Sequence, residues 1–312
     1  MKQKLILSYI IIALFLLSCK KDIPGNTFDT DYFYAQLASN NINIGDSAKF
    51  ILTENPDIIT FYSGEIGHEY KNRNRTVLEG GSLKMKFQTR VTNLPADTLD
   101  VMISNDFSGI YDSTNVANAH WTKLTDSFTF PNPAATLGIF YPSGLTDGQF
   151  LDITSFTTAG KPFYVAYKYD YKAPTNIIWS IAKLGMYNIF PSSFGVANAT
   201  VIDSTQINSG SFGAVQFNDP VSRWSTSSTY LKCTNSLVAP IGAQYWYISR
   251  ALNSSAVAPD LPLIIKNITE SPLKNFEYKY SKPGIYTASI VASYQRLNYE
   301  KTFVKEFTII VQ

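Results

Sequence analysis

The chain has 312 residues, and its 26 Lys and Arg against 24 Asp and Glu give a formal net charge of +2 at pH 7. Such a balance lacks the basic excess of a nucleic-acid-binding protein, so we expect no nucleic-acid partner. A hydrophobic content of 45%, with 20 Tyr and 20 Phe, is ample for packed cores, whereas two cysteines are too few for a cysteine-based metal site.

The N-terminal segment has the pattern of a secretory signal. Lys2 and Lys4 flank the start of an apolar run, LILSYIIIALFLL, that is too short for a standard membrane-spanning helix. The run ends in LLSC, which resembles the lipobox cut by lipoprotein signal peptidase. This resemblance implies a signal peptide at 1–18, a lipid on the sulfur of Cys19 and a tether at 19–27. It therefore implies a lipid-anchored, surface-exposed protein of the outer membrane. The alternative is an ordinary secretory peptide with a chance cysteine.

Beyond the tether, apolar and polar residues alternate as they do in β-strands. In KMKFQTRV (84–91) the residues Met85, Phe87 and Val91 share one side, and the lysines and the arginine share the other. Further strand-like runs are TLDVMIS, PFYVAYKY, YTASIVAS and KEFTIIV, and turn signals lie at 55–56, 63–64, 80–81, 142–144 and 282–284. We predict an all-β chain that forms two β-sandwich domains.

The C-terminal region, FEYKYSKPGIYTASIVASYQRLNYEKTFVKEFTIIV, predicts three strands joined by turns. Pro283 and Gly284 are expected to form a turn in which Gly284 takes a positive φ. Tyr286 would then start an inward-facing set that includes Ala288, Ile290 and Ala292. This pattern resembles the closing strands of PKD-type immunoglobulin-like domains, although their W-x-F-G-D-G turn is missing.

The opening strands of such a domain lie at the other end of the chain. NIGDSAKFILTENPDIITFYSG predicts two strands separated by turns. Neither 28–78 nor 255–312 is long enough for a sandwich alone, but together they approach the roughly 100 residues of an immunoglobulin-like domain. We predict one immunoglobulin/PKD-like sandwich split in sequence, with residues 80–252 inserted as a second domain.

The predicted insert carries the phrases VMISNDFSGIYD, AHWTKLTDSFTF, GQFLDITSF and IIWSIAKLGMYNI. They resemble the jelly-roll, galactose-binding-like "choice-of-anchor" sandwiches of bacterial surface proteins. The whole order of motifs resembles a Bacteroidetes surface lipoprotein family of unknown function, whose members tend to be encoded beside outer-membrane glycan-import machinery. The resemblance implies a location and a partner, either a glycan or an import protein, rather than a reaction.

ITFYSGEIGHEY (59–70) looks most like an active site, because it places His68 between two glutamates. A zinc site would need His120 to converge on it, and a general base would need a nucleophile motif that the chain lacks. Gly64 and Gly67 permit unusual backbone angles, so we predict a structural turn.

Three aspartates are candidates for acid–base chemistry: Asp106, Asp112 and Asp170. Each lies in a loop-like context where aspartate often forms turns. Asp106 is also a candidate ligand for a structural calcium ion. Cys233 is expected to be a buried strand residue. We expect no catalytic residue, and no cofactor apart from that calcium.

Aromatic side chains are the strongest candidates for binding a sugar, because their rings stack on its apolar faces. Three tryptophans lie in strand-like contexts and are expected in the core: Trp121, Trp179 and Trp246. Trp224 lies in polar, turn-rich NDPVSRWSTSSTY, and we predict an exposed platform formed with Arg223 and Tyr230. Tyr169 and Tyr171 in YKYDYKAP are a second choice, in a context where tyrosine at a strand edge is common.

These features predict a lipid-anchored surface protein that binds a glycan or supports a polysaccharide-import complex without catalysis. The first alternative is a structural or protein-interaction spacer with no sugar site. The second is an unrecognised glycoside hydrolase, which would need two carboxylates facing one another across a cleft.

Overall fold

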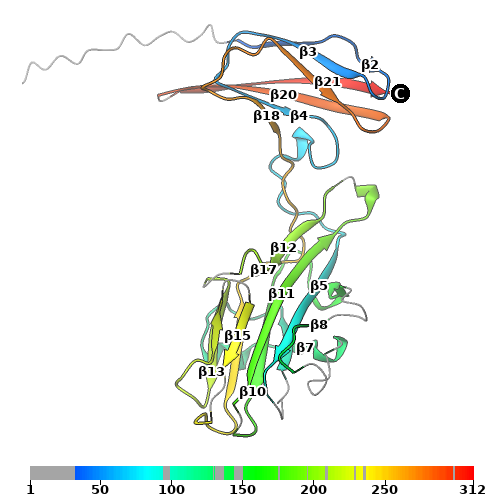
Figure 1. Ribbon diagram of the computed structural model, residues 1–312. Helices are drawn as coiled ribbons and strands as arrows, with labels where there is room; N and C mark the ends of the chain where they lie inside the picture. Colours follow the sequence, from blue (N-terminus) through cyan, green and yellow to red (C-terminus); the bar gives the residue numbers. More distant parts are fainter. Residues whose placement is uncertain are drawn as a thin grey trace, which may run out of the picture. The chain divides into compact units, whose positions relative to one another are not determined.

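The computed structural model describes residues 32–93, 99–128, 130, 137–143, 150–174, 176–194, 196–207, 210–227, 230–234, 237–297 and 299–312. The fold is all-β and consists of several antiparallel sheets, as the alternation predicts (Figure 1). The predicted signal peptide, Cys19 and the tether lie outside the described residues. None of the helices in the described part is long and apolar enough to cross a membrane.

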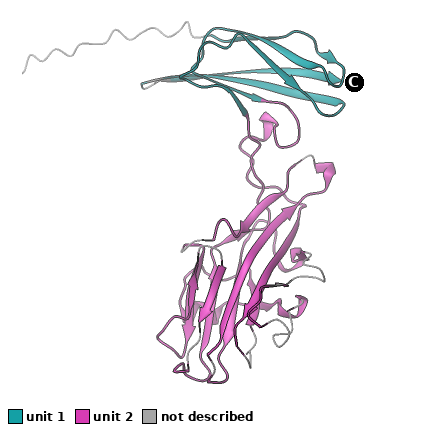
Figure 2. Cartoon of the chain, in the orientation of Figure 1, with its two compact units in different colours: residues 1–61, 263–312 teal, residues 62–262 magenta. Residues whose placement is uncertain are grey.

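The chain forms two compact units (Figure 2). The split unit consists of residues 1–61 and 263–312, and the inserted unit consists of residues 62–262. Both junctions differ from the predicted boundaries at 78 and 255. The reason is local packing: Val77 pairs with Ala256, and Leu78 packs with Val257 on the inserted unit's own apolar cluster.

Two sheets form the split unit. The smaller has the order β1 (Tyr34–Leu37), β3 (Ser47–Thr53) and β19 (Asn275–Lys279). The larger has the order β18 (Leu263–Lys266), β4 (Ile58–Tyr62), β20 (Gly284–Arg296), β21 (Tyr299–Val311) and β2 (Asn41–Ile42). β2 pairs with β21 in parallel, whereas the other recorded pairs are antiparallel.

The two halves of the split unit share one hydrophobic core. Phe50 and Phe61 from the N-terminal half pack in an edge-to-face pair, with ring centroids 5.4 Å apart. Ala288, Ile290 and Ile309 from the C-terminal half belong to the same buried cluster. The predicted common core is therefore confirmed, and each half supplies the apolar partner that the other lacks.

Two predicted turns are wrong in detail. Gly284 does not have a positive φ but is the first residue of β20, where it pairs with Val311. The ring of Tyr286 lies over Gly284, and its hydroxyl donates to the carbonyl of Lys282. Residues 142–143, expected in a turn, belong to β8 (Tyr141–Ser143), which pairs with another strand.

Two larger sheets form the inserted unit. The six-stranded sheet has the order β13 (Phe212–Phe217), β16 (Gln244–Ser249), β10 (Pro162–Asp170), β6 (Leu99–Ser104) and β7 (Thr122–Lys123), and β17 (Leu252–Asn253) pairs with β10. The seven-stranded sheet has the order β14 (Trp224–Thr226), β15 (Tyr230–Thr234), β11 (Ile178–Ile189), β5 (Ser82–Val91) and β8. In that sheet β12 (Ala199–Asp203) pairs with β11, and β9 (Leu151–Asp152) pairs with β5. Short helices are α2 (Ser113–Asn118), η2 (Tyr70–Asn72), η3 (Thr125–Ser127), η4 (Thr154–Phe156) and η5 (Ser192–Phe194).

The core of this sandwich confirms the alternation seen in the sequence. Along β5, half-buried and buried residues alternate without exception, and Met85 and Phe87 belong to the main apolar cluster. The ring of Phe87 meets that of Tyr167 from the other sheet at 5.7 Å, so the two sheets pack face to face. A smaller cluster that includes Val116 of α2 covers the outer side of the six-stranded sheet.

Candidate functional site

The predicted exposed platform at Trp224 is wrong. Only 6% of Trp224 is exposed, and its ring lies parallel to that of Tyr247, with the centroids 5.3 Å apart and the planes at 4°. The indole Nε1 donates to the carbonyl oxygen of Tyr245 at 2.9 Å. Trp224 is therefore a core residue whose one polar atom has a main-chain partner, and its ring is not available to a sugar.

Arg223 belongs to a polar network rather than to a binding surface. Its Nη2 and Nε donate to Oδ2 of Asp219 at 2.9 and 3.2 Å, and the hydroxyl of Tyr245 donates to the same oxygen at 2.7 Å. Burial raises the pKa of Tyr245 to about 12, and the hydrogen bond to the Asp219 carboxylate adds to the effect. Asp219 is almost fully buried, so the network fixes the chain before Trp224.

Tyr169 and Tyr171 are not at an exposed edge either. Both side chains are fully buried. Tyr169 lies on β10, which has β16 on one side and β6 on the other, and its ring stacks on that of Tyr245 at 6.4 Å. A strand with neighbours on both sides and a second sheet above it buries its tyrosines, so this prediction is also wrong.

The structure confirms that His68 lies in a structural turn. Gly64 and Gly67 have φ angles of 80° and 84°, a region that glycine enters without strain. The amide of Gly64 donates to the carbonyl oxygen of His68 at 2.9 Å, and the amide of His68 donates to the carbonyl oxygen of Glu65 at 2.8 Å. The imidazole Nδ1 lies 2.6 Å from the carbonyl oxygen of Leu261, which ties the turn to the returning chain.

The second histidine is paired with the calcium candidate. Nδ1 of His120 lies 2.6 Å from Oδ2 of Asp106, while the His120 amide and the Ser104 hydroxyl donate to Oδ1 at 2.9 and 2.8 Å. Burial opposes ionisation of Asp106, but the bonds from His120 and Ser104 outweigh it and keep the pKa of Asp106 below its usual value. In the described part of the chain no three His, Cys, Asp or Glu residues are grouped to hold a metal ion.

The remaining sequence candidates also have structural contacts. Asp112 caps α2 by accepting from the amide of Asn115 at 2.7 Å. Asp170 forms an ion pair with Lys168 at 2.9 Å. Cys233 is a buried free cysteine, and burial raises the pKa of its thiol. The three tryptophans expected in the core are buried or half-buried: Trp121, Trp179 and Trp246.

One surface of the inserted unit does combine half-buried aromatic rings with hydrogen-bond donors. It is the outer side of the seven-stranded sheet, where β15, β11, β5 and β8 lie side by side (Figure 1). We call it the aromatic–basic face, and define it by eight half-buried side chains: Lys84, Lys86, Gln88, Arg90, Phe140, Phe150, Tyr187 and Tyr230. The strand register brings these side chains together. Ala182 of β11 pairs with Tyr230 of β15 on one side and with Gln88 of β5 on the other, and Tyr187 of β11 pairs with Lys84 of β5.

Arg90 lies at one end of this face between two rings. Its Cζ is 4.3 Å from the ring centroid of Phe140 and 5.6 Å from that of Tyr230, and the two rings are 6.0 Å apart. Nη2 donates to the hydroxyl of Ser180 at 3.3 Å, but Nε is buried and has no hydrogen-bond partner among the described residues. The rings hold the guanidinium in place and leave part of its donor capacity unused.

A second cluster surrounds Lys86. Its Nζ lies 4.3 Å from the ring centroid of Phe150, which meets the ring of Tyr187 edge to face at 5.4 Å. The Tyr187 ring lies across Gly185, where an added Cβ would be 2.6 Å from it, so a side chain there would displace the ring. Burial and the nearby Asp203 carboxylate raise the pKa of Tyr187, which keeps its hydroxyl a donor.

The two clusters form a row rather than a single point. Lys86 and Arg90 are four residues apart on β5, or about 13 Å. Each cluster places a cation over a half-buried aromatic ring, so this face can hold an extended ligand that has both apolar surfaces and polar groups. The sequence alone did not predict this face. The pattern Lys-x-Lys-x-Gln-x-Arg at 84–90 was the signal that could have indicated it, because its polar residues point away from the core.

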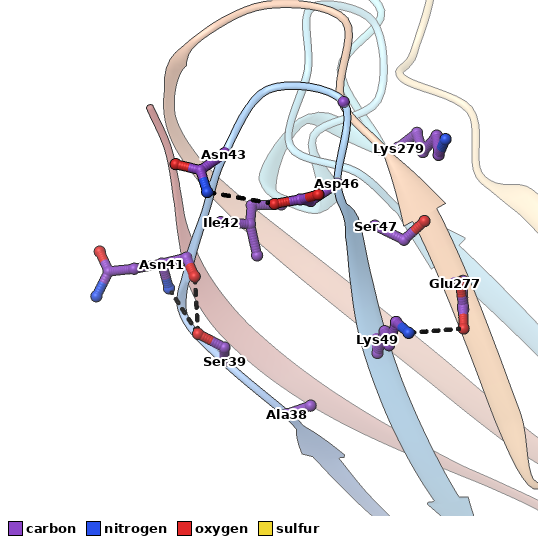
Figure 3. Close-up of a pocket in the computed structure, with 11 residues that line it drawn as sticks. Ala38, Ser39, Asn41, Ile42, Asn43, Asp46, Ser47, Lys49, Glu277 and Lys279 are labelled. Atoms are coloured by element: carbon purple, nitrogen blue, oxygen red, sulfur yellow. Dashed lines mark hydrogen bonds and ion pairs between the residues drawn. The ribbon is translucent and has the colours of Figure 1, made fainter.

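The split unit has a polar groove of about 540 Å³, shown in Figure 3. Asn43 donates to Asp46 at 3.4 Å, and Lys49 pairs with Glu277 at 3.6 Å across the groove wall. None of the described residues that line it is aromatic. The groove offers hydrogen-bonding groups without a platform, so the aromatic–basic face is the better candidate site.

The chain resembles one known protein family. A model of the family described as Domain of unknown function (DUF5017) matches residues 18–208, which is more than half of the chain. No curated protein and no solved structure matches the chain.

Proposed function

The chain belongs to that family, whose description names no activity, and we propose that it is a lipid-anchored surface protein whose inserted unit binds a glycan across the aromatic–basic face. The single observation that supports this best is the pair of aromatic–cation clusters along β5. The apolar C–H face of a sugar can stack on a half-exposed ring, while its hydroxyls accept hydrogen bonds from lysine, arginine and glutamine.

Binding is a better role for this unit than catalysis. Three carboxylates are the sequence's candidates for acid–base work: Asp106, Asp112 and Asp170. They are engaged by the imidazole of His120, by the amide of Asn115 in α2 and by Lys168. A glycosidase needs one carboxyl group free to donate a proton and another free to attack or to activate water. These three carboxylates have structural partners instead.

Two features of the sequence support the proposed cellular location. The segment LLSC ends in Cys19 and resembles a lipobox, so lipid on that sulfur would anchor the protein. The order of motifs along the chain is similar to that of Bacteroidetes surface lipoproteins encoded near glycan-import machinery. We therefore place the protein at the outer membrane, where it would present glycan to a polysaccharide-import complex.

A polysaccharide panel tests this proposal. The full chain, purified in detergent, is screened by affinity electrophoresis, and the best polysaccharide is titrated by calorimetry. Phe140→Ala combined with Tyr187→Ala removes one ring from each cluster. By analogy with stacking of bases on aromatic rings, each lost ring weakens binding by roughly five- to a hundredfold.

Tyr34→Ala is the matched control, because Tyr34 is an aromatic residue of the split unit with 53% of its surface exposed. This variant should bind as the unaltered chain does. Equal binding by all three proteins would exclude the aromatic–basic face as the site. If no polysaccharide binds but an import protein co-purifies, the chain is instead a spacer that acts through protein contacts.

A further inference from the structure

We infer that the ligand of the aromatic–basic face is an anionic glycan, one that carries uronate carboxylates or sulfate groups. This inference rests on the glycan-binding function proposed above and adds the chemical class of the ligand.

The charge of the face is the first observation. Five cations lie on its strands: Lys84, Lys86 and Arg90 on β5, the exposed Lys183 at the bulge of β11, and Lys232 on β15 beside Ser180. The same strands and their neighbours β9 and β12 place two carboxylates there, Asp152 and Asp203. The resulting net charge of +3 stands out, because the whole chain carries only +2.

Both carboxylates already have partners. Asp152 accepts from Nζ of Lys84 and from the hydroxyl of Thr154, each at 2.6 Å. Asp203 accepts from the amide and the hydroxyl of Thr205 at 2.9 and 2.6 Å. Asp152 is therefore balanced by Lys84, whereas Asp203 keeps its negative charge, which the net charge of +3 already includes.

The cations of the two clusters have no such partner. No carboxylate in the described part of the chain lies within salt-bridge distance of Lys86 or Arg90. Their charges are set against aromatic rings rather than against carboxylates. A planar guanidinium that has no carboxylate partner matches a carboxylate or a sulfate better than it matches a neutral hydroxyl.

The spacing indicates a polymer rather than a single sugar. An acidic sugar can stack on Phe140 or Tyr230 while its acid group meets Arg90. Lys86 lies about 13 Å further along the strand, where it can meet the acid group of another unit of the same chain. Repeated negative charge along the ligand would match repeated positive charge along β5.

Matched pairs of polysaccharides test the inference with the full chain in detergent. One pair is polygalacturonate and its fully methyl-esterified form, and the other is dextran sulfate and dextran. In at least one pair we expect the acidic member to bind about tenfold more tightly or better, with an affinity that falls as salt rises. Arg90→Gln should weaken that binding by roughly ten- to a hundredfold.

Lys86→Gln is a second variant that does not disturb the buried end of Arg90, and it should weaken the same binding. Lys161→Gln removes an equal charge from an exposed position of the inserted unit outside the face, and it should change nothing. Thermal unfolding followed by tryptophan fluorescence verifies that each variant is folded.

Two outcomes separate this inference from the function on which it rests. If the neutral members bind as tightly as the acidic ones and Phe140→Ala weakens both, the face binds glycans but the anionic class is wrong. If no polysaccharide binds, or if binding is the same in every face variant, the glycan function itself fails and the inference fails with it.

Discussion

Replacing Trp224 by alanine should destabilise the inserted unit by about 3–5 kcal/mol, the usual cost of truncating a buried aromatic residue. Trp224 is 6% exposed and stacked on Tyr247. Burying about 200 Å² of apolar surface at about 25 cal/mol per Å² gives about 5 kcal/mol, in agreement with that range. Trp224→Phe keeps a stacked ring but loses the donor to Tyr245, so it should cost only about 1–2 kcal/mol.

Intrinsic tryptophan fluorescence reports the loss of stability of the inserted unit. All four tryptophans lie within the inserted unit: Trp121, Trp179, Trp224 and Trp246. In urea, with a slope of about 2 kcal/mol per M, the midpoint for Trp224→Ala should fall by about 1.5–2.5 M. An unchanged midpoint together with weaker glycan binding would show that Trp224 is an exposed binding residue, and would refute the reasoning.

Three further predictions concern charge, the histidine turn and the lipid anchor. The Lys84 hydrogen bond, aided by Thr154, lowers the pKa of Asp152 from 3.8 to about 2. The stabilising effect of the ionised Asp152 is therefore present above pH 4 and is lost as the pH falls through about 2. Asp152→Asn should cost about 0.2–1 kcal/mol at pH 7, as expected for an exposed ion pair, and only a small part of that near pH 2. A cost that urea titrations find equal at both pH values would contradict this. His68→Gln should cost about 0.5–1 kcal/mol, since it loses one exposed hydrogen bond to Leu261, and calorimetry should show glycan binding unchanged; lost binding with normal stability would place His68 in the site. Cys19→Ala should move the protein out of the membrane fraction or block its processing, and a cleaved variant that still sediments with membranes would exclude the lipid anchor.

Short-range patterns predicted the strands well because alternation is a local property. In β5 each apolar residue of KMKFQTRV faces the core, since a strand turns successive side chains to opposite sides. The split core was predictable for a related reason. The apolar strand that contains Phe61 had no partner nearby in sequence, and the strand that contains Ile290 supplied it.

Predictions that depended on tertiary partners failed. The segment around Trp224 is polar, but Asp219 accepts hydrogen bonds from Arg223, and the carbonyl of Tyr245, 21 residues further on, accepts from the indole of Trp224. Tyr169 was expected at an edge because sequence does not reveal that β16 and β6 flank its strand. The aromatic–basic face was missed because Phe140 and Phe150 meet β5 only through a register set by the fold.

Hydroxyl-radical footprinting of the full chain, with and without the tightest-binding polysaccharide of the panel, tests glycan binding at the aromatic–basic face most directly. Aromatic side chains react readily with the radical, and mass spectrometry assigns the oxidation to single residues. Bound polysaccharide should reduce the oxidation of Phe140, Tyr187 and Tyr230 and leave that of Tyr34 in the split unit unchanged. Unchanged oxidation of the three face residues at saturating polysaccharide, or protection only of the split unit, would contradict the assignment.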